Sequence, residues 1–368
     1  MDSLSIYIHI PFCEQKCPYC DFYSISNKNE YDNYVENLKW LIEHYSRIYH
    51  RKICTIYFGG GTPSVLKARR LADILCTIKS NFDVVDDAEI TVEVNPCSSD
   101  NLDFDMLKKA GFNRVSIGLQ SSDENELRLL GRRHTADEAK DTVLRARKAG
   151  FDNISLDLMI CVPTQTKSSL TKSIEFCKDC NVNHISAYIL KFEENTPFFI
   201  IKNSFELFDD DSQAEMYLHV VNELAKHGYN QYEISNFCKD GFEGKHNLRY
   251  WRDQEYLGLG PSAHSFVDNK RFYYSRNIED FYRNIVIEDG VGGDAEEYIM
   301  LSLRLKEGLN LETLCSRYNF TLSKNFLYRI NKLKSEGLVV FESSVVSLTK
   351  RGFLGSNTII NYLLDALY

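Results

Sequence analysis

Cys13-Glu-Gln-Lys-Cys17-Pro-Tyr-Cys20 is the stretch that decides the fold, and it follows directly on an apolar run at residues 4–10. Three thiolates in one short loop can ligate three irons of a [4Fe–4S] cubane and leave the fourth iron without a protein ligand. A small molecule can bind that iron through its own amino and carboxylate groups. The alternatives are three buried thiols or a zinc site, which normally has a fourth protein ligand nearby or a bound water.

Outward from this loop, strand-like and helix-like patterns alternate. Apolar runs that predict strands lie at residues 4–10, 53–58, 89–94, 114–118, 153–159 and 184–190. Between them, helical spacing occurs, for example at residues 31–48, 70–78 and 137–149, and Ala-Gly-Phe at 110–112 and 149–151 is typical of helix ends. Strands that alternate with helices indicate a parallel sheet, and six units are too few for an eight-fold barrel. We therefore expect an incomplete, open (β/α)6 TIM-like barrel over residues 1–235.

The pattern changes twice in the remaining third. Residues 236–290 are aromatic and irregular with Gly-rich turns, which indicates a segment that covers the barrel. Residues 291–368 contain helical spacing at 296–305, 311–318 and 322–337, followed by short β-rich runs at 338–341 and 345–348. Helices followed by a hairpin predict a small winged-helix-like α+β domain, a common packing solution that does not by itself imply DNA binding.

Composition excludes several classes of function. The net charge of −9 argues against a general nucleic-acid binder, since phosphate backbones are bound through surplus Lys and Arg. No run approaches the roughly 18 apolar residues of a membrane span. Eleven cysteines, three of them within eight residues, favour metal binding or redox work over disulfides. Because the sequence enters its first strand without an export signal, we expect a cytoplasmic protein.

The cysteine spacing resembles the CxxxCxxC signature of the radical S-adenosylmethionine (SAM) superfamily. In that family the aromatic residue beside the third cysteine, here Tyr19, packs near the SAM adenine. Gly59-Gly60-Gly61-Thr62-Pro63, after the second strand, resembles the loop that approaches the SAM amino group, where glycines allow close backbone contact. The resemblance implies that Cys13, Cys17 and Cys20 hold a [4Fe–4S] cluster, and that Tyr19, Gly60, Gly61 and Thr62 contact SAM.

The resemblance narrows, over essentially the whole chain, to the group that contains oxygen-independent coproporphyrinogen III oxidase (HemN) and the heme chaperone HemW. Its first strand is similar to Tyr7-Ile8-His9-Ile10-Pro11-Phe12-Cys13. By this resemblance the polar residues that contact SAM are Tyr7, Glu93, Gln120, Arg132 and Asp157. All but Arg132 lie on or just after predicted strands, towards the carboxyl ends where such barrels build their sites. One departure is Cys161-Val162-Pro163-Thr164-Gln165, where the group has Gly-Leu-Pro-Gly-Gln.

Three features separate the chaperones from the oxidases within this group. The oxidases have a further cysteine where this chain has Phe22, and an N-terminal extension that is absent before Cys13. His246-Asn247-Leu248-Arg249-Tyr250-Trp251 matches the HNxxYW motif that marks the chaperones and is associated with heme binding. Neutral imidazole is a common heme ligand, and Arg249 could meet a propionate. We expect His246 to bind heme, with Cys238 as an alternative ligand.

The sequence thus predicts a radical SAM heme chaperone with a [4Fe–4S] cluster, SAM and heme. Its expected partners are heme, acceptor apo-hemoproteins and a reductant such as a flavodoxin or ferredoxin, and the resemblance leaves a homodimer open. Reductive SAM cleavage is expected, whereas coproporphyrinogen oxidase activity is not favoured. The rivals are that oxidase, which would abstract hydrogen from propionates and lead to decarboxylation, and a radical SAM enzyme acting on an unrelated substrate.

Overall fold

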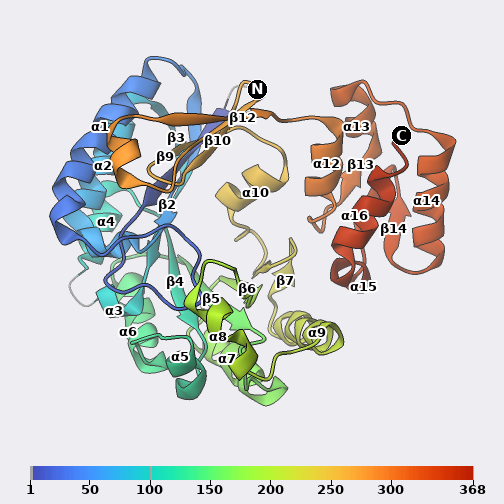
Figure 1. Cartoon of the computed structure of the whole chain (residues 1–368), viewed down its shortest axis with the longest axis horizontal. Helices are drawn as coiled ribbons and strands as arrows, with labels where there is room; N and C mark the ends of the chain where they lie inside the picture. Colours follow the sequence, from blue (N-terminus) through green and yellow to red (C-terminus); the bar gives the residue numbers. More distant parts are fainter. Residues whose placement is uncertain (1–2, 100–101, 368) are drawn as a thin grey trace.

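The computed structural model describes residues 3–99 and 102–367, and a twelve-stranded sheet dominates it (Figure 1). Its centre is six parallel strands in sequence order, each hydrogen-bonded to the next, as the alternating pattern predicts. They are β1 (Ser3–Ile10), β2 (Lys52–Gly60), β3 (Asp83–Val94), β4 (Arg114–Gln120), β5 (Asn153–Ile160) and β6 (His184–Ile189). The six predicted strands are therefore confirmed.

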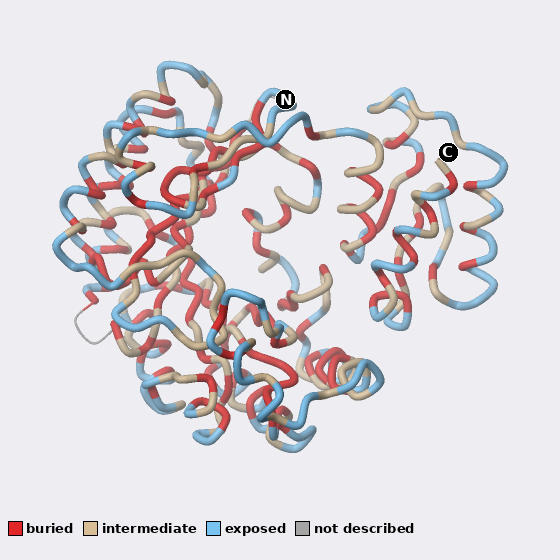
Figure 2. The backbone as a smooth tube through the Cα atoms, viewed as in Figure 1, coloured by how far each residue is buried: buried red, intermediate tan, exposed pale blue. Residues whose placement is uncertain are grey.

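Helices cover the outer face of these strands and bury their apolar sides against it (Figure 2). The longer ones are α1 (Tyr31–Ser46), α2 (Lys67–Asn81), α4 (Phe104–Ala110), α6 (Ala136–Lys148), α7 (Lys167–Asp179) and α9 (Asp210–Lys226). The shorter ones are α3 (Pro96–Ser99), α5 (Glu124–Leu129) and α8 (Pro197–Ile201), with 3-10 turns η1 (Lys28–Glu30), η2 (Pro63–Leu66) and η3 (Lys202–Ser204). Gly111 ends α4 with a left-handed φ of 110°, and a Thr135–Glu138 capping box begins α6.

Further strands extend both edges of the sheet. Beside β6 lies the antiparallel β8 (Asn236–Cys238), and β7 (Asn230–Gln231) pairs antiparallel with β8 at the edge. Beside β1 lies the parallel β9 (Tyr256–Leu259), followed by the antiparallel β10 (His264–Val267), β11 (Lys270–Tyr274) and β12 (Val286–Val291). The sheet does not close, since β12 and β7 remain at its edges. Residues 236–290 thus contribute strands as well as α10 (Lys245–Trp251) and α11 (Ile278–Tyr282).

The C-terminal region is a separate α+β unit, as its pattern predicts. Its three-stranded antiparallel sheet has the order β13-β15-β14. Its elements are α12 (Ala295–Ser302), β13 (Leu309–Asn310), α13 (Leu311–Tyr318), α14 (Lys324–Ser335), β14 (Val339–Glu342), β15 (Val345–Leu348), α15 (Lys350–Leu354) and α16 (Ser356–Leu364). Figure 1 shows this unit beyond α10, and hydrogen bonds from Arg317 to Asp253 tie it to the residues that follow α10.

The inner face of the parallel strands is polar. Thr55 and Tyr57 on β2, and Arg114 and Ser116 on β4, alternate with buried apolar residues that face the helices. The barrel interior is therefore suited to hold a ligand. Within the described residues, no helix is long and apolar enough to cross a membrane.

Candidate functional site

One cavity of about 1270 Å³ runs through the open barrel. It exceeds the roughly 300–1,000 Å³ of an ordinary small-molecule pocket, so it has room for more than one ligand. Apart from the two further heme candidates Cys238 and Arg249, the residues that the sequence assigns to the cluster, SAM or heme all line this cavity: Tyr7, Cys13, Cys17, Tyr19, Cys20, Gly60, Gly61, Thr62, Glu93, Gln120, Arg132, Asp157 and His246.

The cysteine loop borders one part of the cavity. Cys13, Cys17 and Cys20 are free, half-buried thiols, and hydrogen bonds of Ile25 with Pro11 (2.8 Å) and Cys13 (3.0 Å) close the loop. Among the described residues, no three His, Cys, Asp or Glu side chains are gathered to hold a single metal ion. Three thiols on one short loop are a ligand set that suits a cluster with one thiolate at each of three irons.

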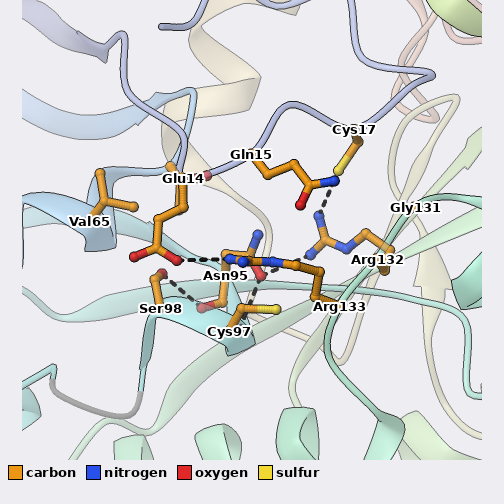
Figure 3. Close-up of a pocket in the computed structure, with 11 residues that line it drawn as sticks. Glu14, Gln15, Cys17, Val65, Asn95, Cys97, Ser98, Gly131, Arg132 and Arg133 are labelled. Carbon is orange, nitrogen blue, oxygen red and sulfur yellow. Dashed lines mark hydrogen bonds and ion pairs between the residues drawn. The ribbon is translucent and has the colours of Figure 1, made fainter. Parts of the chain in front are cut away.

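The side chain of Arg132 extends towards Cys17 of this loop (Figure 3). Its Nη1 donates to Cys17 Sγ at 3.6 Å, while Nη2 donates to Gly118 O at 2.8 Å and to Asn95 Oδ1 at 3.2 Å. Beside it, Arg133 pairs with Glu14 at 2.8 Å. These residues surround a small cavity of about 20 Å³, enough for roughly one water. A fixed positive charge therefore lies against the Cys17 thiol.

The glycine loop after β2 packs its backbone directly on the end of β1. Gly61 N donates to Ile10 O at 2.8 Å and Thr62 N donates to Phe12 O at 2.7 Å. A Cβ on Gly61 would lie 2.7 Å from Phe12 O, so a side chain cannot fit there. Thr62 Oγ1 is in turn 3.4 Å from Cys13 Sγ. The loop thus presents backbone to the cavity immediately beside the cysteines.

Two buried carboxyl groups face the cavity. Burial raises the pKa of Glu93 to about 7, although its Oε1 accepts a 2.7 Å hydrogen bond from the Tyr57 hydroxyl. Burial also raises the pKa of Asp157, which accepts from Ser116 at 3.2 Å. Such carboxyl groups ionise more readily when a cation binds beside them. They therefore suit a ligand with an amino or sulfonium group.

The remaining SAM candidates are placed by tight local structure. Tyr7 is hydrogen-bonded to His9 Nδ1 at 3.0 Å, and Tyr19 packs edge-on against Phe198. Gln120 ends β4 with a φ of 71°, a left-handed conformation that is uncommon outside glycine and often found at binding sites.

The loop after β5 is the segment at residues 161–165, where this chain departs from the Gly-Leu-Pro-Gly-Gln of the group. Cys161 and Thr164 have φ values of 61° and 73°, the region that glycine adopts without steric cost. Gln165 holds this loop: its Oε1 accepts from Cys161 N at 2.7 Å, and its Nε2 donates to Met159 O and Glu126. The chain therefore keeps the backbone path that glycines favour while carrying strained residues at both positions.

His246 lies on α10, buried at the base of the cavity. Its ring stacks on Tyr57 at 5.2 Å between centroids. The Thr55 hydroxyl donates its proton to Ser5, so its oxygen accepts the Nδ1 proton of His246 at 2.7 Å. The other ring nitrogen, Nε2, then carries a lone pair, which accepts a hydrogen bond from the Tyr250 hydroxyl at 2.8 Å. Burial lowers the pKa of His246 to about 3. The ring is therefore neutral, with the lone pair that a metal ligand needs on Nε2.

Two other heme-related candidates lie away from the cavity. Arg249 donates to Ser3 O at 2.8 Å and to Glu255 O at 3.2 Å, and Cys238 is buried in β8. Neither is among the described residues that line the cavity. Sequence reasoning also missed two residues that do line it, Tyr57 and Arg114. Their signal was a polar or hydroxylated residue at every second position of an otherwise apolar strand.

Comparison with known proteins gives the family. Residues 7–177 match the model of the radical SAM superfamily, and residues 294–354 match that of the HemN C-terminal domain. The heme chaperone HemW of Lactococcus lactis is 34% identical over 372 residues, which cover 98% of this chain and 97% of the relative. HemW of Bacillus subtilis is 34% identical over 380 residues, covering 99% and 100%. The chain belongs to the HemW family.

The fold of this chain matches that of HemN. The solved structure of coproporphyrinogen III oxidase (HemN) from Escherichia coli, described as a radical SAM enzyme, matches with a TM-score of 0.83 and 22% identity, covering 98% of this chain and 89% of that one. At this identity the likeness shows the fold alone. Phe22 lines the cavity and is 67% exposed.

Proposed function

We propose that this protein is a radical SAM heme chaperone that binds heme through His246 and delivers it to acceptor hemoproteins. The observation that carries the proposal is the state of His246: a neutral, buried imidazole that lines the same cavity as the cysteine loop, with its Nε2 lone pair accepting a hydrogen bond from the Tyr250 hydroxyl. Nδ1 is fixed by Thr55, an arrangement that orients many metal-binding histidines.

The cluster and SAM would occupy the part of the cavity near the loop. Cys13, Cys17 and Cys20 would ligate three irons, while Gly60, Gly61 and Thr62 would receive the amino group of SAM. The other contacts would come from Tyr7, Tyr19, Glu93, Gln120, Arg132 and Asp157. When bound, the reduced cluster supplies the electron for reductive cleavage of the SAM sulfonium. The chain's own part is to hold the ligand, neutralise its charges and exclude water.

The proposal also covers the partners of the protein and its location in the cell. A flavodoxin or ferredoxin would supply electrons, apo-hemoproteins would accept heme, and the protein would act in the cytoplasm, as a monomer or homodimer. We divide the chain into a barrel at residues 1–235, a segment with the heme motif at 236–290 and a HemN-type C-terminal domain at 291–368.

The test is an anaerobic heme titration of cluster-reconstituted protein followed by Soret absorbance. Wild type is compared with His246→Ala and with a matched control, His264→Ala, which removes an exposed histidine outside the cavity. We expect saturable binding in wild type and His264→Ala, and a sharp loss in His246→Ala.

Three results would contradict the proposal. Equal binding by wild type and His246→Ala would exclude this histidine as the ligand. No binding by any variant, together with anaerobic turnover of coproporphyrinogen III, would favour the oxidase instead. SAM cleavage without either property would favour an enzyme acting on another substrate.

A further inference from the structure

Arg114 is a buried cation without a hydrogen-bonding partner. It begins β4, is 4% exposed and lines the cavity. Its Nε is buried and unsatisfied, and its guanidinium takes part in none of the hydrogen bonds or ion pairs found among residues 3–99 and 102–367. A guanidinium carries five N–H donors, and burying charged donors without acceptors is strongly unfavourable. The fold therefore keeps a costly, unused donor group at this point.

The neighbouring acids do not use these donors. Both oxygens of Glu89 accept backbone N–H groups of α10, from His246 at 2.9 Å and Lys245 at 3.0 Å. Asp157 accepts from serine hydroxyls. Both acids act on Arg114 only through longer-range attraction. The other arginine of the cavity, Arg132, differs, because both of its Nη atoms donate to defined acceptors.

Arg114 lies close to the helix that carries His246. A Cβ placed on Gly244, which caps α10, would be 3.9 Å from Arg114 Nη2. The positive charge of Arg114 is one of the influences that keep His246 neutral. One end of the same cavity thus holds an imidazole lone pair beside free guanidinium donors, while the cysteine loop lies beyond the other end of β4, roughly 20 Å away along the strand.

We propose that Arg114 binds a carboxylate of the tetrapyrrole whose iron is bound by His246. This inference rests on the proposed function and adds the residue that recognises the propionate side chains. A guanidinium binds a carboxylate through two parallel N–H···O bonds, which supplies both energy and orientation. Arg249, the nearer arginine in the sequence, cannot do so, because it is bound to backbone carbonyls outside the cavity.

The competing explanation is that Arg114 only balances the charge of Glu89 and Asp157. The two explanations differ in what they predict for the ligand. A carboxylate receptor discriminates between hemin and hemin dimethyl ester, in which both propionates are esterified. A structural counter-charge does not, since the esterified and free ligands fill the cavity alike.

The experiment measures equilibrium binding of hemin and of its dimethyl ester, at one fixed ionic strength, to wild type, Arg114→Gln, Arg114→Lys and Arg249→Gln. Arg249→Gln is the matched control. We expect wild type and the control to bind hemin about tenfold or more tightly than the diester, as for a hydrogen bond to a charged group. Arg114→Gln should bind both ligands with the affinity that wild type has for the diester. Arg114→Lys should still prefer hemin, by a smaller factor than wild type.

The outcomes separate the role of Arg114 from the proposed function. Equal binding of hemin and diester by wild type would overturn the role of Arg114 and leave the proposed function intact. The same proportional loss for both ligands in Arg114→Gln would also overturn it, as a structural effect. No hemin binding by wild type would overturn the proposed function and the tetrapyrrole assignment together. Should Arg114→Gln fail to fold, the wild-type preference and Arg114→Lys still decide.

Discussion

The Tyr250 hydroxyl donates a 2.8 Å hydrogen bond to Nε2 of His246, one helical turn earlier in α10. The nitrogen that would bind iron is therefore occupied by a tyrosine in the ligand-free protein. In the proposed function, heme iron would have to displace this hydroxyl to reach Nε2, and the hydrogen bond would re-form when heme leaves.

Tyr250→Phe removes that competing bond and should strengthen heme binding. A buried hydrogen bond contributes about 0.5–1.5 kcal/mol, which corresponds to roughly two- to tenfold in affinity. The measurement is a heme titration beside Tyr256→Phe, whose ring packs edge-on against Tyr250 at 4.5 Å but whose hydroxyl accepts from Arg271. Weaker binding in Tyr250→Phe alone would mean that the hydroxyl helps to hold heme.

Arg132→Gln should make the reduction potential of the cluster more negative. The Arg132 guanidinium donates to Cys17 Sγ, and such donors stabilise the more negative, reduced cluster. The expected shift is on the order of tens of millivolts, since a one-electron couple moves about 59 mV for a tenfold change. Spectroelectrochemistry without SAM separates this effect from a lost SAM contact. Arg133→Gln, which removes a half-exposed partner of Glu14, is the control and should leave the potential unchanged.

Thr164→Gly should stabilise the protein. Thr164 is exposed, with a φ of 73°, and a β-branched residue in the left-handed region costs roughly 1–2 kcal/mol. Part of this gain is offset because glycine is more flexible in the unfolded chain. We therefore expect the free energy of unfolding, measured in urea, to rise by about 1 kcal/mol. Thr77→Gly, within α2, should instead destabilise. A loss of stability in Thr164→Gly would show that the threonine makes a compensating contribution.

Glu93→Gln should stabilise the ligand-free protein at alkaline pH. The folded-state pKa of Glu93 is raised to about 7 from 4.5, so the folded protein binds a proton in this range that the unfolded chain releases. The destabilisation from its charge is absent below pH 4.5, grows up to pH 7 and is complete above it, at about 3 kcal/mol. Unfolding free energies of both proteins across pH 5–8 should diverge as pH rises. A constant difference would contradict the buried-carboxylate explanation.

The sequence predicted the fold where a local pattern reports it. Strands such as β4 and β5 alternate with helices at regular intervals, and their boundaries differ from the prediction by one or two residues at most. The cysteine loop was predictable because its three thiols lie within one short segment, so their proximity needs no tertiary contact. The edge strands β7 to β12 were not predictable as part of the sheet, because they are short and join it only where β8 pairs with β6 and β9 pairs with β1 across long stretches of chain.

Side-chain direction limited the prediction of the candidate site. The motif around His246 identifies the histidine, but sequence alone does not show that Arg249 turns towards the backbone of Ser3, or that Arg114 faces the cavity without a partner. Both facts depend on where α10 sits against the sheet. Polar alternation along β2 and β4 was the available signal for the cavity wall, and it would have drawn attention to Tyr57 and Arg114.

The pairing of β1 with β9 also bears on when the cysteine loop gains its support during synthesis. Ser5 aligns with Tyr256 in this pairing. Two contacts from the segment that follows hold the cysteine loop: Arg276 donates to the Asp21 carboxylate, and Ile278 N donates to the Tyr23 hydroxyl at 3.0 Å. These two residues are synthesised some 250 residues after the cysteines, roughly 13–50 s later at ribosomal speeds of 5–20 residues per second. Until residues 276–278 are made, these two contacts cannot form, so the cysteine loop lacks that support during the interval.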